Sequence, residues 1–383
     1  MLFLYITNAR IPTEKANGIQ IMENCRALSK MQDVEVSLIS SKRVGLKSKN
    51  PFKYYNFDKT FEFKRIFSID LLFFPFAKFA TFVLQAVSFT VFSFIYALMN
   101  GRDIDLVYTR DFYIAFALSF LEPVFYEVHS LPSAPSVLHK LAWKRSKTLI
   151  VISNALRDDL IKFGVPKNKI LVARDGVDVD RFNTDITKER ARKKLNTYLN
   201  TYLNRYLIVY TGHLYSWKGV DTLAQAVEKL SKDTHVFLVG GTDEDVERFR
   251  EQYSAENLHI VGHRPQAEIP VWLKSADLLV LPNSVKEKIS SHYTSPLKLF
   301  EYMSSGTPIV ASDLPSIREV LNDGDAVFFT ADDPNSLSNA IKESFNKYSD
   351  LEKQARILAQ DAKKYNWENR AKMIINKILE SIR

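Results

Sequence analysis

Residues 295–321, SPLKLFEYMSSGTPIVASDLPSIREVL, contain two helical patterns with a short apolar strand between them. Apolar residues at 297, 299, 300 and 303 follow the period of a helix, and Gly306 is a typical helix terminator. The run PIVAS (308–312) is short and continuously apolar, as in parallel strands that helices cover on both faces. Residues 313–316, DLPS, are predicted to open a second helix, IREVL (317–321). The stretch therefore indicates an α/β fold with a parallel sheet.

Similar apolar runs alternate with helical patterns along the whole chain, which favours a sequence of βα units. A length of 383 residues suits two domains, so we predict two α/β domains in tandem. The turn-rich stretch 175–182 marks their boundary, and 367–382 is predicted to be a terminal amphipathic helix. The ten predicted strands are residues 2–7, 34–40, 105–110, 148–153, 169–173, 206–212, 235–241, 258–262, 277–282 and 308–312.

Composition is that of an ordinary globular protein, with 46% hydrophobic and 25% charged residues. Cys25 is the only cysteine, so an intrachain disulfide is excluded and a reducing compartment is favoured. The apolar run near the N-terminus is short, and we expect it to form the first buried strand rather than a signal peptide.

Two stretches of the first half are unusual. Residues 42–65 carry eight Lys and Arg but two Asp and Glu, which suits nucleic acid, an anionic membrane surface, an acidic acceptor or simply a solvated loop. Residues 71–99 are almost wholly apolar, and 79–98 contain no charge. This length would span a membrane. However, a single crossing would separate strands of one sheet, so a buried core helix or a helix in the membrane interface is favoured.

The stretch YTGHLYSWKGVDTL (210–223) predicts a strand, a loop and a helix start. Its loop lies at the carboxyl end of a parallel strand, where such sheets bind ligands. Lys218 could supply a cation for phosphate there, together with the N–H groups of the helix start. The pattern is not a Walker A loop. A surface lysine beside a glycine turn is the alternative.

Glu301 lies about one turn into the helix that starts at TSPLK (294–298). A proline is well tolerated at such a helix start, and the N–H groups there favour an anion. A carboxylate in this place can accept hydrogen bonds from ribose hydroxyls, or it can simply stabilise the helix. The residues alone leave both roles open.

Taken in order, these stretches resemble glycosyltransferase family 4. The segments GHLYSWKG (212–219), 261–283 and 295–321 are similar to the carboxyl domain of that family, and RIPTEKANGIQI (10–21), YEVHS (126–130) and 151–182 are similar to its amino domain. The resemblance implies a GT-B fold, in which two Rossmann-like domains face each other across a central cleft. It places an acceptor-side domain at 1–178 plus the C-terminal helix 366–383, and a donor-binding domain at 179–365.

The resemblance also implies a retaining, metal-independent transferase that needs no cofactor and uses a nucleotide diphosphate sugar as co-substrate. Lys218 matches the lysine that holds the donor diphosphate, and Glu301 matches the glutamate that bonds the ribose. His129 matches the histidine near the reacting sugar. The remaining matches are Gly18 (loop near the phosphates), Gly262, His263 and Arg264 (loop near the base), and Ser295, Pro296, Leu297 and Lys298 (backbone N–H groups facing phosphate or sugar).

Two positions depart from the family pattern. His213 stands where the family often has arginine, and a histidine with an ordinary pKa of about 6.5 is a weaker cation. Tyr293 stands eight residues before Glu301, where the family has another glutamate. A tyrosine can bond a sugar hydroxyl but cannot act as a carboxylate, so the identity of the sugar is left open. Of the two D-x-D patterns, 103–105 is interpreted as the end of a turn before a strand and 178–180 as part of the joint between the domains, and no metal site is predicted.

The expected protein is a glycosyltransferase at the cytoplasmic face of the membrane, acting on a glycan or lipid-linked acceptor. Its expected partners are a nucleotide-sugar donor, that acceptor and an anionic membrane surface contacted through 42–99, without nucleic acid. The alternatives are a nucleotide-sugar epimerase or phosphorylase on the same fold, and a non-catalytic sugar-nucleotide-binding protein.

Overall fold

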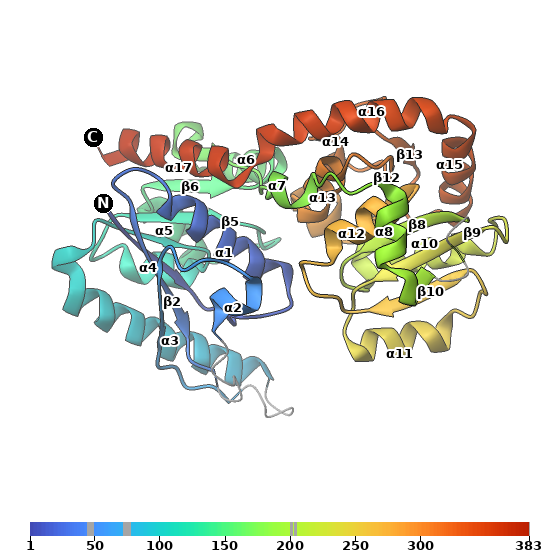
Figure 1. Ribbon diagram of the computed structural model, residues 1–383. Helices are drawn as coiled ribbons and strands as arrows, with labels where there is room; N and C mark the ends of the chain where they lie inside the picture. Colours follow the sequence, from blue (N-terminus) through green and yellow to red (C-terminus); the bar gives the residue numbers. More distant parts are fainter. Residues whose placement is uncertain (44–49, 72–77, 200–201, 203–204, 383) are drawn as a thin grey trace. The chain divides into compact units, whose positions relative to one another are not determined.

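The computed structural model describes residues 1–43, 50–71, 78–199, 202 and 205–382. The chain divides into two compact units (Figure 1), one formed by Met1–Asp175 with Trp367–Arg383 and the other by Gly176–Asn366. The boundaries expected from the sequence are residues 178 and 365. Residues 44–49 of the basic stretch and 72–77 of the apolar stretch lie outside the described residues.

The first unit is built on a parallel sheet, and its described residues form seven strands in the order β3-β2-β1-β4-β5-β6-β7. Its central strands are buried on both faces, in agreement with their continuous runs of apolar residues. Two strands were not among the predicted runs, β3 and β5, because charged residues interrupt them. The strands are β1 (Leu2–Thr7), β2 (Glu35–Ser41), β3 (Glu62–Ile66), β4 (Leu106–Thr109), β5 (Val124–Val128), β6 (Thr148–Val151) and β7 (Ile170–Val172).

Helices connect these strands, and the last helix of the chain belongs to the same unit. Arg370 of that helix donates a hydrogen bond of 2.8 Å to Asn24 of the first helix, which ties the C-terminal segment to the N-terminal one. The helices are α1 (Ala16–Ser29), α2 (Pro51–Tyr55), α3 (Lys78–Asn100), α4 (Phe112–Leu118), α5 (Val137–Arg145), α6 (Asn154–Lys162) and α17 (Trp367–Ile382).

The second unit contains another parallel sheet, whose described strands follow the order β10-β9-β8-β11-β12-β13. The prediction of two Rossmann-like α/β domains is thus confirmed. Among the described strands of this second sheet, the short β13 is the one that was not predicted from the sequence. The strands are β8 (Tyr206–Thr211), β9 (Thr234–Val239), β10 (Leu258–Gly262), β11 (Leu278–Leu281), β12 (Ile309–Ser312) and β13 (Val327–Phe329).

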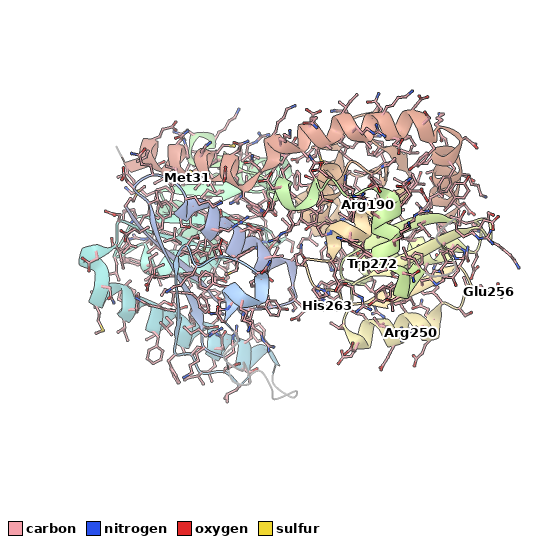
Figure 2. All side chains as sticks on the ribbon, viewed as in Figure 1. Met31, Arg190, Arg250, Glu256, His263 and Trp272 are labelled. Atoms are coloured by element: carbon pink, nitrogen blue, oxygen red, sulfur yellow. The ribbon has the colours of Figure 1, made fainter. Side chains whose placement is uncertain are left out.

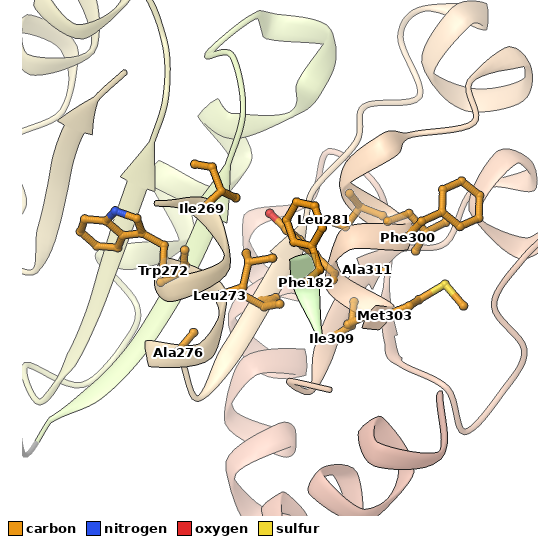
Figure 3. Packing of buried hydrophobic residues seen from close by; sticks show 14 of the residues in the cluster. Phe182, Ile269, Trp272, Leu273, Ala276, Leu281, Phe300, Met303, Ile309 and Ala311 are labelled. Atoms are coloured by element: carbon orange, nitrogen blue, oxygen red, sulfur yellow. The ribbon is translucent and has the colours of Figure 1, made fainter. Parts of the chain in front are cut away.

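The helices of the second unit bury the sheet and place its loops. Figure 3 shows α12 and α13 contributing Trp272, Leu273, Phe300 and Met303 to a core that also contains Ile309 of β12. The helices are α7 (Val179–Phe182), α8 (Lys188–Lys194), α9 (Asn196–Leu199), α10 (Val220–Val227), α11 (Asp243–Gln252), α12 (Ile269–Ser275), α13 (Leu297–Ser305), α14 (Pro315–Arg318), α15 (Pro334–Asn346) and α16 (Tyr348–Asp361).

The opening stretch of the sequence folds largely as its pattern predicts. The helix α13 ends at Gly306, which adopts the left-handed conformation (φ 68°) that glycine reaches without strain. The strand β12 follows at once. The second helix, α14, begins at Pro315, inside the stretch expected to open it, and ends at Arg318, so it is shorter than expected.

The apolar stretch of the first unit forms α3. Residues Phe79–Asn100 are, in the described part of the chain, the one helical segment long and apolar enough to cross a membrane by length and composition, with a mean hydropathy of 1.9. Strands β1, β2 and β3 precede α3 and β4 follows it, and all four belong to one sheet. A single crossing by α3 would place these paired strands on opposite sides of the bilayer, so the topology argues against a span.

Candidate active site

Three loops meet at the carboxyl edge of the second sheet. Gly212 follows β8, Gly240 follows β9, and Gly262 ends β10. A Cβ on Gly240 would lie 2.2 Å from the carbonyl oxygen of Gly212, and its φ of 131° also requires glycine. The glycines therefore allow the loops to approach closely at the edge where parallel sheets bind ligands.

Lys218 is positioned by a rigid loop after β8. The loop forms a 3-10 turn, Ser216–Lys218, and Gly219 then takes a φ of 69°, where a Cβ would lie 1.7 Å from the carbonyl oxygen of Pro282. Ser290 Oγ donates to the carbonyl of Trp217 at 3.0 Å. The loop is thus held against the segment after β11. Desolvation lowers the pKa of Lys218 to about 8, as expected for an ammonium sheltered from water.

The helix α13 begins at the same edge. Pro296 is its N-cap and supplies no side-chain hydrogen bond to the first turn. Tyr302, on the same helix, accepts a hydrogen bond of 2.9 Å from the backbone N–H of Thr211 at the end of β8. Ser295 is buried just before the helix. The N-terminal turn at Leu297, with its positive dipole end, is therefore fixed beside the end of β8.

Glu301 lies one turn further along α13 and is partly exposed. Its Oε1 accepts a hydrogen bond of 3.3 Å from Gln266 Nε2, on the loop that follows β10. The same loop carries His263, which is labelled in Figure 2, and Arg264. Arg264 donates to the carbonyl of Val261 at 3.1 Å, so its guanidinium holds the loop in shape. The structure thus brings Glu301 together with the loop expected near the base.

The structure also shows the surroundings of His213 and Tyr293, the two residues that depart from the family pattern. The ring of His213 stacks on Tyr215, with centroids 4.8 Å apart and an interplanar angle of 4°. Tyr293 is almost fully buried in a π-helical turn, Ile289–Tyr293, and the ammonium of Lys288 lies 4.9 Å from its ring centroid. Short π-helical turns often occur at functional sites.

In the first unit, His129 contacts a buried carboxylate that the sequence did not single out. His129 Nε2 lies 2.5 Å from Oε1 of Glu127, and the guanidinium of Arg370 lies 3.0 Å from the same oxygen. Burial would raise the pKa of Glu127, but Arg370 and His129 lower it well below its usual range. Burial and the charge of Arg110 lower the pKa of His129. His129 therefore rests on an ionised carboxylate and favours its neutral form.

Gly18 has a packing role in the first unit. It is buried in α1, and a Cβ there would lie 2.3 Å from the hydroxyl of Tyr55 and 2.5 Å from Thr13 Cγ2. The missing side chain makes room for these protein atoms. His129 and Gly18 belong to the first unit and the other candidate residues to the second, so the structure groups them within their own units.

No cluster of three or more His, Cys, Asp and Glu suited to a metal is found among the residues that the structure describes. The D-x-D aspartates have structural contacts instead. Asp105 Oδ2 accepts from the N–H of Leu2 at 2.7 Å, and Asp178 accepts from the N–H of Arg181 at the start of α7.

Comparisons with known proteins agree with this fold. Residues 18–181 match Glycosyltransferase Family 4 and residues 205–347 match Glycosyl transferases group 1. The D-inositol 3-phosphate glycosyltransferase of Paenarthrobacter aurescens is 23% identical over 248 residues, which are 61% of this chain and 57% of that protein. The phosphatidyl-myo-inositol mannosyltransferase of Mycobacterium tuberculosis is 32% identical over 126 residues, 32% of each. The matches span about half or less of these relatives' lengths.

Among solved structures, Anabaena HepE in complex with UDP-glucose is similar along its whole length. The TM-score is 0.76 at 16% sequence identity, over 99% of this chain and 100% of that one. The fold is therefore that of the GT-B glycosyltransferases. The chain belongs to glycosyltransferase family 4, as its sequence motifs indicated.

Proposed function

We propose that this protein is a retaining glycosyltransferase that moves a sugar from a nucleoside diphosphate sugar to a glycan or lipid-linked acceptor. The observation that carries the proposal is the grouping of Lys218, Glu301 and the uncapped N-terminus of α13 at one edge of the second sheet. A cation and helix N–H groups suit a diphosphate, and a carboxylate suits ribose hydroxyls. Family membership and the UDP-glucose complex of HepE support the same substrate class.

The difficult step of such a transfer is departure of the nucleoside diphosphate. As the bond between sugar and phosphate breaks, negative charge develops on the phosphate oxygens. Lys218 and the amides at 295–298 would stabilise that charge, and preorganised donors of this kind are usually the largest catalytic contribution. The acceptor hydroxyl then attacks from the face that the leaving group vacates, its proton passes to an oxygen of the departing diphosphate, and no enzyme nucleophile is required.

A thermal-shift screen tests the proposal. UDP, GDP, ADP and their glucose or mannose conjugates are added separately, with uridine as a control that lacks the diphosphate. One nucleoside diphosphate and its sugar should raise the melting temperature, because a ligand at 100 times its Kd stabilises the folded state by about 2.7 kcal/mol. A protein that none of these ligands stabilises would contradict the proposal. Turnover of the sugar nucleotide without any acceptor would instead indicate an epimerase or a hydrolase.

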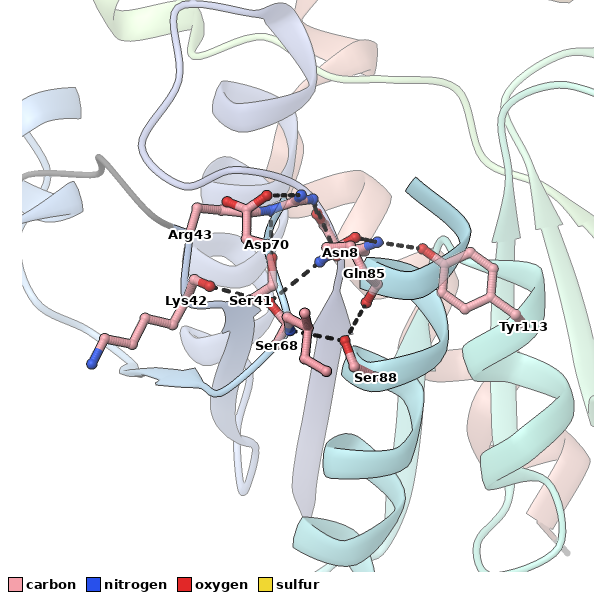
Figure 4. A network of polar contacts seen from close by, with 10 residues as sticks. Asn8, Ser41, Lys42, Arg43, Ser68, Asp70, Gln85, Ser88 and Tyr113 are labelled. Atoms are coloured by element: carbon pink, nitrogen blue, oxygen red, sulfur yellow. Dashed lines mark hydrogen bonds and ion pairs between the residues drawn. The ribbon is translucent and has the colours of Figure 1, made fainter. Parts of the chain in front are cut away.

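We further propose that α3 rests on the cytoplasmic surface of a membrane. A soluble amphipathic helix normally buries its apolar stripe, but α3 buries Ala86, Phe89 and Ala97 together with polar residues and leaves a further apolar face exposed. Its buried face carries Gln85 and Ser88, which bond to Asn8 and to the backbone of Ile69 (Figure 4). Every fourth residue along its outer face is apolar and exposed: Phe79, Val83, Val87, Val91, Ile95 and Met99.

A lipid bilayer is the partner whose chemistry fits this face. Exposed Phe67 packs edge-on against Phe92 of α3, at 5.1 Å between ring centroids, and extends the apolar surface. Lys53 and Lys59, from the basic stretch that precedes α3, are exposed and suit anionic lipid heads, each charge near such a surface contributing about 1 kcal/mol. The mycobacterial relative, by its name, acts on a phosphatidyl-inositol lipid.

Vesicle co-sedimentation tests the membrane proposal with two matched variants. The full chain should sediment with phosphatidylcholine vesicles that contain phosphatidylglycerol at low salt. Val87→Glu should weaken binding by about tenfold or more, because the burial of one valine contributes about 1.5 kcal/mol. Val137→Glu, at an exposed valine of α5, adds the same charge elsewhere and should bind like the unmodified protein. Equal binding by both variants would rule out α3 as the contact.

A further inference from the structure

The side chain of Lys298 is buried without a counter-ion in hydrogen-bonding contact. The residue is 8% exposed, and its ammonium has no hydrogen-bond partner in the described part of the chain. The nitrogen lies 4.0 Å from the ring centroid of Tyr210 and 3.5 Å from the place that a Cβ on Gly212 would occupy. Since Gly212 is exposed at the end of β8, the ammonium lies just beneath the ligand-binding edge of the sheet.

Such a placement is unfavourable in the ligand-free protein. Taking an ammonium out of water costs several kcal/mol unless an anion compensates it. Burial and the charge of Lys218 lower the pKa of Lys298 well below its usual range, and only Glu301 acts in the opposite direction. The groups that face the ammonium are thus the aromatic ring of Tyr210, a second cation and one carboxylate. An arriving dianion would satisfy both lysines at once.

The position of Lys298 also explains how the site can function with His213. The ring of His213 is stacked on Tyr215, and a neutral imidazole cannot replace a permanent guanidinium charge. Lys298 and Glu301 are three residues apart on α13 and therefore lie on the same side of the helix. One helix thus presents an N-terminal turn without a side-chain cap, a cation and a carboxylate to the same edge.

We infer that the side chain of Lys298 is the second cation for the donor diphosphate, taking the place of the arginine that family members often have at position 213. The inference rests on the proposed function, because it assumes a nucleoside diphosphate ligand. It assigns the Lys298 side chain a direct contact with phosphate, in addition to the backbone N–H of this residue. Burial and the charge of Lys218 disfavour the charged form of Lys298 in the empty site, so proton uptake is expected when the diphosphate binds.

Calorimetric titration with UDP tests this assignment. Binding is measured at pH 8 in two buffers with different ionisation enthalpies, which reports the protons taken up. Lys298→Met should lose about 10- to 100-fold in UDP affinity, since a hydrogen bond to a charged group contributes about 1.5–3 kcal/mol. It should also lose the proton uptake due to this lysine. Lys298→Arg should keep most of the affinity but not the uptake, because arginine stays protonated.

Two controls separate the possible results. Lys229→Met removes an exposed lysine of the same unit and should bind UDP like the unmodified protein. Ligand-free Lys298→Met should melt at the same temperature or higher, since it removes a buried amine that has no hydrogen-bond partner among the described residues. Unchanged UDP affinity in Lys298→Met would overturn the role of Lys298 alone. Absence of nucleoside diphosphate binding by the unmodified protein would overturn this inference together with the proposed function.

Discussion

Lys218→Ala is expected to lower kcat for sugar transfer by about 10²- to 10³-fold, the loss typical of removing one preorganised donor to developing negative charge. The lysine stands at the end of β8 on a loop that Gly219 and the Trp217 carbonyl hold in place, so a neighbouring side chain cannot easily replace it. Transfer from the sugar nucleotide that the thermal-shift screen identifies provides the measurement. Full activity of Lys218→Ala, with an unchanged melting temperature, would remove Lys218 from the mechanism.

The pH dependence of the activity, compared with that of Lys218→Arg, provides a matched control for this variant. Because desolvation lowers the pKa of Lys218 to about 8, the free enzyme carries this cation below pH 8 and loses it above. The pH profile of kcat/KM reports the pKa values of essential groups in the free enzyme. The value of kcat/KM should therefore fall as the pH rises through 8. Lys218→Arg keeps a charge at every accessible pH and should lose that contribution to the fall while retaining part of the activity.

The apolar strands of both sheets were predictable because each is a short continuous run, and α13 was predictable because Gly306 ends its apolar period. The strands β3 (EFKRI) and β5 (VFYEV) escaped prediction for a physical reason. The first is an edge strand whose side chains are half exposed, so it needs few apolar residues. The second buries Glu127, a charge that only tertiary partners can stabilise.

In the candidate site, too, some features could be predicted from the local sequence and others depend on tertiary contacts. Lys218 and Glu301 follow a strand end and a helix start, so local patterns singled them out, although the residues alone left their roles open. The burial of Lys298 and the contact between Glu127 and Arg370 depend on residues far apart in the chain, so no local pattern encodes them. The orientation of α3 was also hidden, because the buried Gln85 has its hydrogen-bond partners, Asn8 and Ser68, in segments distant in the sequence.

Arg370→Met is expected to destabilise the first unit by about 3–5 kcal/mol, because it leaves a buried carboxylate without its cation. Both side chains are almost fully inaccessible, and Arg370 also donates to Asn24 and to the carbonyl of Arg174. The ion pair therefore joins α17 to α1 and β5. Hydrogen exchange of peptides from β5, followed along a urea series, would report the loss for this unit separately.

A double variant and an exposed pair make this test specific. Glu127→Gln with Arg370→Met should cost less than the sum of the single changes, since neither partner is then left as an uncompensated buried charge. The pair Lys377 and Glu380 lies on the same helix at 3.2 Å but near the surface, so Lys377→Met should change stability by about 0.5 kcal/mol or less. If Arg370→Met were as mild as Lys377→Met, α17 would be held by apolar packing alone. His129 would then rest on a carboxylate that does not need Arg370.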